Sequence, residues 1–127
     1  MSKPKKSAKP SQAAKAKKTL PVVKKVTAAE KDFAVFQQRA AGKRIVLHIG
    51  CGSENPEKLH KSFRNENWFE LRLDIDPNAK PDIVSDMVKM VSIPNESVDA
   101  IWSSHNIEHL YPHIVPEAMK EFNRVLK

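Results

Sequence analysis

The chain has 127 residues, close to the commonest size of a single domain, so we expect one hydrophobic core. It contains no apolar run of the roughly 18 residues that a membrane helix needs, and its single cysteine, Cys51, excludes an internal disulfide. The net charge of +7 is local, because nine lysines and no acidic residue precede position 26, whereas 13 basic and 15 acidic side chains follow. These features predict a cytoplasmic protein that does not enter membranes.

Residues 1–26 form a segment rich in lysine, alanine and proline with almost nothing to bury. Its ordering entropy would go uncompensated, so we expect it to be disordered. Two roles remain open for it: a solvated tail, or a basic arm that contacts nucleic acid or another polyanion without reading sequence. Residues 27–127 are the predicted domain.

The domain begins with a predicted helix followed by a strand. Thr27 and Glu30 have the spacing of a capping box, and Phe33, Phe36 and Ala40 then share one helical face before a stop at Gly42. Residues 44–50, "RIVLHIG", are short and apolar and end at glycine, which favours a strand.

Three further strands are predicted, over residues 68–74, 81–87 and 97–105. The crossover at residues 53–67 is a poor helix, with Pro56 near its start. A final helix opens at Pro112 or Pro116 and carries apolar residues at helical spacing. Short strands that alternate with helices and loops predict an α/β domain with a parallel sheet.

The first strand ends in two glycines, Gly50 and Gly52, with only Cys51 between them. In doubly wound sheets ligands bind beyond the carboxyl ends of the strands, where glycines allow tight turns and close backbone approach. Asn55 stands where a dinucleotide motif has its third glycine, so a nucleoside ligand is favoured. Asp74 ends the next strand at the spacing of a ribose-binding carboxylate. The alternatives are a plain tight turn and a strand-end cap.

Four segments in this order carry a resemblance to a known family: "VLHIGCGS", "LRLDIDP", "PDIVSDM" and "SVDAIWSSHNIEHL". Across residues 45–127 the chain resembles the class I S-adenosylmethionine-dependent methyltransferases, especially the small bacterial type 11-like group. The resemblance implies a Rossmann-like sheet in the order 3-2-1-4, S-adenosylmethionine as cofactor, and methyl transfer to an unidentified acceptor.

The resemblance also implies roles for individual residues. Asp74 would bind the ribose, Asp86 and Met87 would lie near the adenine, and His105 after the fourth strand is the candidate base. His48 departs from the family, because many relatives have an acidic residue there. Asp86 has an alternative role as a cap for the next segment. The implied cofactor-binding set is His48, Gly50, Cys51, Gly52, Asp74, Ile75, Asp86, Met87 and Ser104.

The segment from His105 to His109 also fits H-x-x-E-H, a zinc-hydrolase pattern in which Glu108 would activate a metal-bound water. Such a site needs a long helix and a third ligand, whereas this segment directly follows a strand and precedes Pro112. The pattern therefore remains a lesser alternative, and we expect no metal ion. Cys51 is expected to be a small packed residue.

Class I methyltransferases have seven strands in the order 3-2-1-4-5-7-6, and this sequence supplies the first four. We therefore expect the cofactor-binding half of the fold, with the outer edge of the fourth strand open to self-association or to a partner. A second function class stays open, namely a cofactor-binding or interaction remnant without catalysis.

Overall fold

The computed structural model describes residues 25–127, so the predicted disordered tail lies almost wholly outside the described residues. The helices are α1 (Ala28–Ala40) and α2 (Val115–Val125). The strands are β1 (Arg44–Ile49), β2 (Trp68–Asp74), β3 (Ile83–Val84) and β4 (Ala100–Ser103). Short 3-10 turns make up the rest of the regular structure: η2 (Pro56–Lys58), η3 (Lys61–Phe63), η4 (Pro77–Ala79) and η5 (Ile107–His109).

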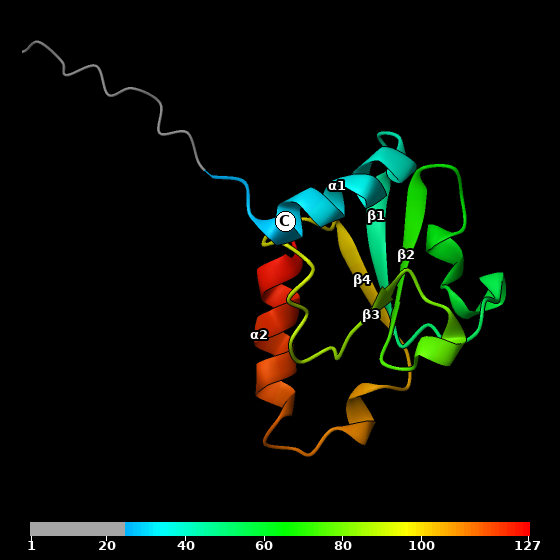
Figure 1. Ribbon diagram of the computed structural model, residues 1–127. Helices are drawn as coiled ribbons and strands as arrows, with labels where there is room; N and C mark the ends of the chain where they lie inside the picture. Colours follow the sequence, from blue (N-terminus) through cyan, green and yellow to red (C-terminus); the bar gives the residue numbers. More distant parts are fainter. Residues whose placement is uncertain (1–24) are drawn as a thin grey trace, which may run out of the picture.

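The four strands form one parallel sheet in the order β3-β2-β1-β4, which confirms the predicted Rossmann-like α/β fold. In register, His48 of β1 lies between Arg72 of β2 and Trp102 of β4. All strands run away from α1, so their carboxyl ends gather at the lower edge of the sheet in Figure 1. The loops that follow the strands therefore meet at that edge.

Helix α1 begins as the sequence predicts. The Thr27 hydroxyl accepts the Glu30 N–H at 3.1 Å, and the Glu30 carboxylate accepts the Thr27 N–H at 2.8 Å. This reciprocal pair satisfies two backbone donors that the first helical turn leaves open. The helix ends at Ala40, and its C-cap, Ala41, has a left-handed backbone, one residue before the predicted stop at Gly42.

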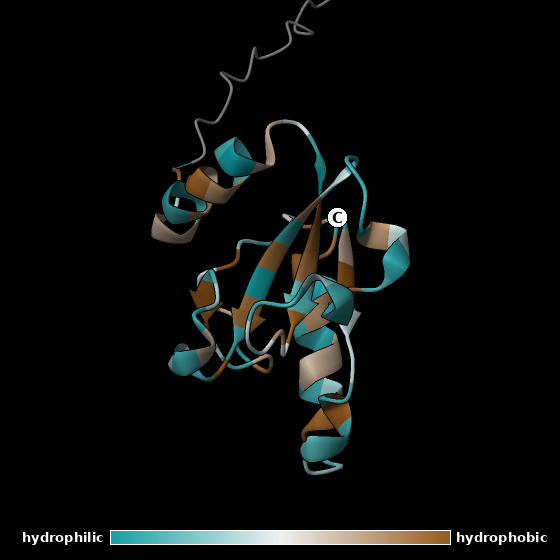
Figure 2. Cartoon of the chain, turned by 90° about the vertical axis from the view of Figure 1, so that its right-hand side faces the viewer, coloured by the Kyte–Doolittle hydropathy of each residue, from teal (hydrophilic) through white to brown (hydrophobic). Residues whose placement is uncertain are grey.

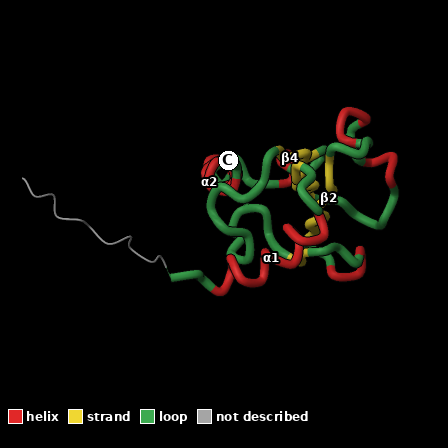
Figure 3. The backbone as a smooth tube through the Cα atoms, turned by 90° about the horizontal axis from the view of Figure 1, so that it is seen from above, coloured by secondary structure: helices red, strands yellow, loops and turns green. Residues whose placement is uncertain are grey.

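The two faces of the sheet differ in polarity. Ile45, Leu47 and Ile49 of β1 point into the main core, where α1, α2 and the loop before β4 cover them. The opposite face carries His48, Glu70 and Arg72 under the short turns between β1 and β2. Figure 3 shows α2 on one side of the strands and these turns on the other, and Figure 2 shows hydrophobic colour concentrated on the strands. The second face is where a polar site can form.

The third and fourth strands are shorter than predicted, because side chains replace ladder bonds at their starts. The Asp82 carboxylate accepts the Arg72 N–H at 2.9 Å, so β3 begins only at Ile83. The Asp99 carboxylate likewise accepts the Ile45 N–H at 2.8 Å, just before β4. Residues 97–98 instead donate to the carbonyl of Val125, at the end of α2.

Helix α2 begins at Val115 with Pro116 in its first turn, which selects the second of the two predicted starts. Arg124 anchors the loop before β4, because its guanidinium donates to the carbonyls of Met90 and Ile93 at 2.9 and 2.8 Å. Glu121 fixes Arg124 through an ion pair at 2.6 Å. Within residues 25–127, no helix is long and apolar enough to span a membrane.

The outer edge of the sheet is covered just before β4 begins. Leu126 forms a parallel bridge with Val98, and the Lys127 N–H donates to the Val98 carbonyl at 3.0 Å. In the described part of the chain, the β4 strand itself pairs only with β1. The predicted open edge therefore begins after this bridge.

The Glu121–Arg124 pair predicts a pH dependence of stability. The hydrogen bond from Arg124 lowers the pKa of Glu121, so the folded protein binds a proton there less readily than the unfolded chain. The resulting stabilisation is present above the ordinary glutamate pKa and is lost as the pH falls through the lowered one. Glu121→Gln should lower the free energy of unfolding by about 1 to 3 kcal/mol at neutral pH, and by less in acid.

Urea titrations of both proteins at neutral pH and in acid measure this difference. Glu117→Gln is the matched control, since Glu117 is exposed and pairs with Lys120 only at 3.6 Å. An equal loss in the two variants at neutral pH contradicts the prediction.

Candidate functional site

The turn after β1 is built around two glycines with left-handed backbones. Gly50 has φ of 68° and Gly52 has φ of 62°, a region that other residues enter at a cost. The N–H groups of Gly50 and Cys51 both donate to the carbonyl of Leu73, at 2.8 and 3.2 Å. The turn is thereby held against the end of β2.

Asp74 connects this turn to the next loop. Its Oδ2 atom accepts the Gly52 N–H at 2.8 Å, and its Oδ1 atom accepts the Asp76 N–H at 2.9 Å. Asp74 therefore caps the strand end, as one alternative predicts. A carboxylate has about four acceptor positions, so each oxygen can still accept a hydrogen bond from a ligand.

Arg72 reinforces the same connection, a role that no motif in the sequence predicts. Its guanidinium donates to the carbonyl of Gly52 and to the carbonyl of Lys80, the latter at 3.0 Å. The arginine thus links the turns that follow β1 and β2. Its side chain lies on the polar face because it alternates with Leu71 and Leu73 along β2.

A cavity of about 210 Å³ lies at the carboxyl ends of β1 to β3. It brings together five of the residues that the sequence predicts for cofactor binding. Its other lining residues were not predicted from the sequence. The predicted members are Gly50, Asp74, Ile75, Asp86 and Met87, and the further ones include Ser85, Asn106 and Leu110. Carboxylates beside apolar side chains suit a nucleoside, whose hydroxyl and amino groups donate and whose planar base is apolar.

Asp86 has a second task within this cavity. Its Oδ1 atom accepts the Val88 N–H at 2.9 Å, so the carboxylate caps the turn after β3. No hydrogen bond within residues 25–127 involves its other oxygen. The two roles predicted for Asp86, as a cap and as an adenine ligand, are therefore compatible, because one oxygen caps the turn and the other is available to a ligand.

Asn106 closes the space above Gly50. Its amide nitrogen donates to the Ile49 carbonyl at 2.8 Å and contacts the Ser103 hydroxyl at 3.0 Å. A Cβ atom on Gly50 would overlap the Asn106 amide. Gly50 is therefore required by an internal contact, which joins the loop after β4 to the turn after β1.

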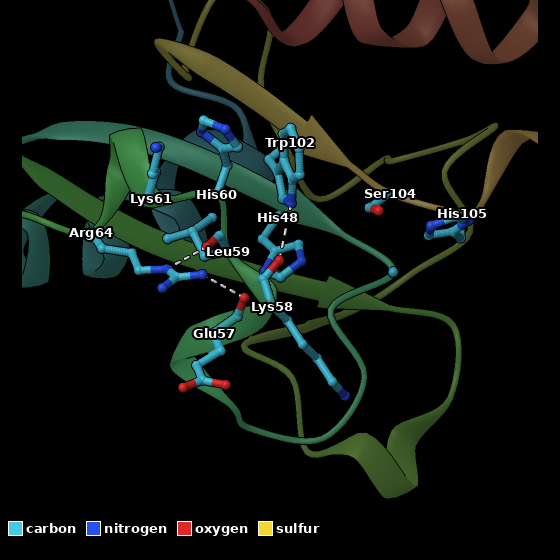
Figure 4. Close-up of a pocket in the computed structure, with 11 residues that line it drawn as sticks. His48, Glu57, Lys58, Leu59, His60, Lys61, Arg64, Trp102, Ser104 and His105 are labelled. Carbon is cyan, nitrogen blue, oxygen red and sulfur yellow. Dashed lines mark hydrogen bonds between the residues drawn. The ribbon is translucent and has the colours of Figure 1, made fainter.

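A larger cleft of about 680 Å³ lies on the polar face of the sheet and shares Gly50 with the cavity. It contains three further predicted residues, His48, Ser104 and His105 (Figure 4). The crossover supplies most of its other lining, including Lys58, His60 and Arg64. The predicted residues thus divide between two adjoining spaces.

Two predicted residues line neither space. Cys51 is 1% exposed, and burial raises the pKa of its thiol, so it behaves as a packed residue and not as a nucleophile. Gly52 contributes its N–H to Asp74, and a Cβ there would lie 2.8 Å from Lys58 Nζ. Both residues shape the turn that borders the cavity.

The H-x-x-E-H segment does not form the helical face that a zinc site requires. Ile107–His109 is a single 3-10 turn, and the His105 side chain is 90% exposed and lies 3.4 Å from the Glu108 carboxylate. Across residues 25–127, the structure gathers no three histidine, cysteine or acidic side chains that could hold a metal ion. The geometry gives the zinc alternative no support.

The contact between Gly50 and Asn106 generates a prediction. Gly50→Ala should lower the free energy of unfolding by about 2 to 4 kcal/mol, because alanine opposes the positive φ and overlaps the amide. In an Asn106→Ala background the overlap disappears, so the same change should cost only about 1 to 2 kcal/mol. Urea unfolding of the four proteins, followed by tryptophan fluorescence, measures the coupling. Additive costs would show that the two residues do not interact.

The comparisons with known proteins agree with this geometry. Residues 47–127 match the family model described as a methyltransferase domain, which covers more than half of the chain and includes both the cavity and the cleft. No curated protein and no solved structure matches the chain. With the glycine turn, the acidic strand end and the sheet order all inside or beside the matched region, the chain belongs to the methyltransferase domain family.

Proposed function

We propose that the chain binds S-adenosylmethionine and contributes to methyl transfer from it to an acceptor. The observation that carries this proposal is the contact between Asp74 and Gly52 at 2.8 Å, which fixes a carboxylate beside the turn after β1. Membership of the methyltransferase domain family supports it. When bound, the cofactor supplies an electrophilic methyl group.

The described residues fit the cofactor part by part. Asp74 offers free acceptor positions to the ribose hydroxyls, and Asp86 offers its unpaired oxygen to the adenine amino group. Ile75 is 67% exposed and Met87 lies in the same cavity, so the two can cover the faces of the planar base. Gly50 borders both spaces, at the turn beside which the sulfonium end of the cofactor would lie.

The cleft on the polar face provides the space for the methyl acceptor. Methyl transfer depends chiefly on the alignment of the acceptor with the methyl carbon, and on a base only where the acceptor holds its proton. His105, the base expected from the sequence, stays a prediction. Its exposed position on a loop with φ of 57° leaves it open to solvent.

Isothermal titration with S-adenosylhomocysteine tests the proposal. The wild-type protein should bind it, and Asp74→Ala should weaken binding by about tenfold to a hundredfold, because one or two hydrogen bonds to a carboxylate are lost. Asp32→Ala is the matched control, since Asp32 is an exposed residue of α1 far along the chain from the cavity.

Two results would contradict the proposal: no binding by the wild-type protein, or equal affinities of wild type and Asp74→Ala. Circular dichroism of the variant excludes unfolding as the cause of lost affinity. Binding without methyl transfer to any acceptor would support the non-catalytic alternative.

A further inference from the structure

The polar face of the sheet contains a dyad, a buried histidine and a half-buried glutamate, that the proposed cofactor site does not use. His48 is 3% exposed, and its Nδ1 atom lies 2.6 Å from Oε1 of Glu70 on the neighbouring strand. In register His48 pairs with Arg72, and Glu70 lies two residues before Arg72 on the same face of β2, so the parallel sheet itself holds the two side chains together. Such a short contact requires a proton between the two atoms.

The dyad fixes the chemistry of the histidine ring. The Glu70 carboxylate is an acceptor, so Nδ1 carries the proton, and in the neutral ring Nε2 then presents a lone pair. No hydrogen bond of the described residues satisfies Nε2. A buried polar atom without a hydrogen-bond partner costs free energy. A ligand in the cleft that His48 lines can remove this cost by donating a hydrogen bond to Nε2.

The other residues that line the cleft indicate which kind of ligand would carry this donor. The rings of His60 and Trp102 lie 5.1 Å apart, and the Trp102 indole N–H is occupied by the Lys58 carbonyl at 3.1 Å. The indole N–H is therefore not available to a ligand, and Trp102 can contribute only apolar ring surface to the cleft. Figure 4 shows the His48 ring and Trp102 within the same group of lining residues.

Charge favours an anion in this cleft. Its lining includes three cationic side chains, Lys58, Lys61 and Arg64, against one carboxylate, that of Glu57. Arg64 is held in place by the carbonyls of Leu59 and Glu57, each at 2.6 Å (Figure 4). A planar molecule with a negative group and a hydroxyl matches this lining. Its ring would pack on the aromatic side chains, its negative group would face the basic ones, and its hydroxyl would donate to Nε2.

We propose that this cleft is the methyl-acceptor site, that the acceptor is a planar anion bearing an ionisable hydroxyl, and that His48, positioned by Glu70, takes its proton. This inference rests on the proposed function. The acceptor oxygen gives its proton to Nε2 and forms a bond to the methyl carbon as the carbon–sulfur bond of the cofactor breaks. The products are the methyl ether, the neutral thioether and an imidazolium that Glu70 stabilises.

The location of the dyad supports this role. His48 lies two residues before Gly50, the residue shared by the cleft and the nucleoside cavity. A proton accepted there is shielded from water, since the His48 ring is buried, whereas His105 is 90% exposed. Glu70 touches neither space and acts through His48, so it is a positioning residue.

The first test is the protonation pattern of the ring in the full chain labelled with 15N-histidine. Two-bond nitrogen–proton correlation spectra should show His48 with its proton on Nδ1 and a bare Nε2. Glu70→Gln should keep this pattern, because its amide oxygen still accepts, and Glu70→Leu should lose it. A proton on Nε2 in the wild-type protein, or an unchanged pattern in Glu70→Leu, would overturn the proposal.

The second test uses small probes and the two tryptophans as reporters. 4-Hydroxybenzoate should shift the indole signal of Trp102 and leave that of Trp68, which does not line the cleft. It should bind about fivefold more tightly than benzoate, which lacks the hydroxyl, and about tenfold more tightly than the cation 4-hydroxybenzylamine. His48→Phe should abolish the preference for the hydroxyl. Absence of any shift at Trp102, or an unchanged preference in His48→Phe, would overturn the proposal.

These tests do not depend on cofactor binding, so the two hypotheses can fail separately. Titration of the full chain labelled with 13C at the methionine methyl groups with S-adenosylhomocysteine should shift the Met87 signal in the nucleoside cavity. A Met87 shift without a Trp102 response to the probes refutes the acceptor site alone. A Trp102 response without any effect of S-adenosylhomocysteine refutes the proposed function.

Discussion

The hydrogen bond from the Gly52 N–H to the Asp74 carboxylate is the contact on which the site depends. It joins the turn after β1 to the end of β2, and Asp74 uses its other oxygen to fix the start of the next loop. Arg72 adds a second tie through the Gly52 carbonyl. A turn with two left-handed glycines would otherwise be free to change conformation, since glycine has the widest range of backbone angles. The carboxylate thus organises its own binding site before a ligand arrives.

The short crossover between β1 and β2 explains why this domain has a cleft on one face. A full helix there would cover β1 and β4, as helices do on both faces of most parallel sheets. Pro56 and the 3-10 turns η2 and η3 replace it. Neither turn has a buried residue, and Leu59 between them is the one buried residue of positions 53–67. The uncovered area is where His48, Trp102 and the basic side chains of the crossover meet. Polar residues on β1 and β2 can persist in the sheet because they pair with each other across strands.

The sequence predicted the features that local chemistry determines. The capping box of α1 and the strand-ending glycine motif follow from residues within a few positions of each other, and the sheet order followed from the family resemblance. The lengths of β3 and β4 could not be predicted, because Asp82 and Asp99 cap partners that are 10 and 54 residues away in sequence. The roles of Asn106 and of the His48–Glu70 dyad could not be predicted for the same reason. Each depends on a contact between segments that only the arrangement of the strands brings together. Asp86 was open to two readings because one carboxylate serves a turn and a cavity at once.

The bridge between Val98 and Leu126 has a practical consequence for handling the protein. Lys127 continues this parallel pairing through its N–H and adds an ion pair with Asp99 at 3.1 Å. A peptide fused directly after Lys127 would therefore start beside the backbone of β4, running parallel to it. An affinity tag or fluorescent fusion at that end would compete for hydrogen bonds at the sheet edge, next to the strand that leads to Ser104 and His105. Attachment ahead of α1, where the chain enters from residue 25 on the outside of the domain, leaves the sheet edge unaltered (Figure 1).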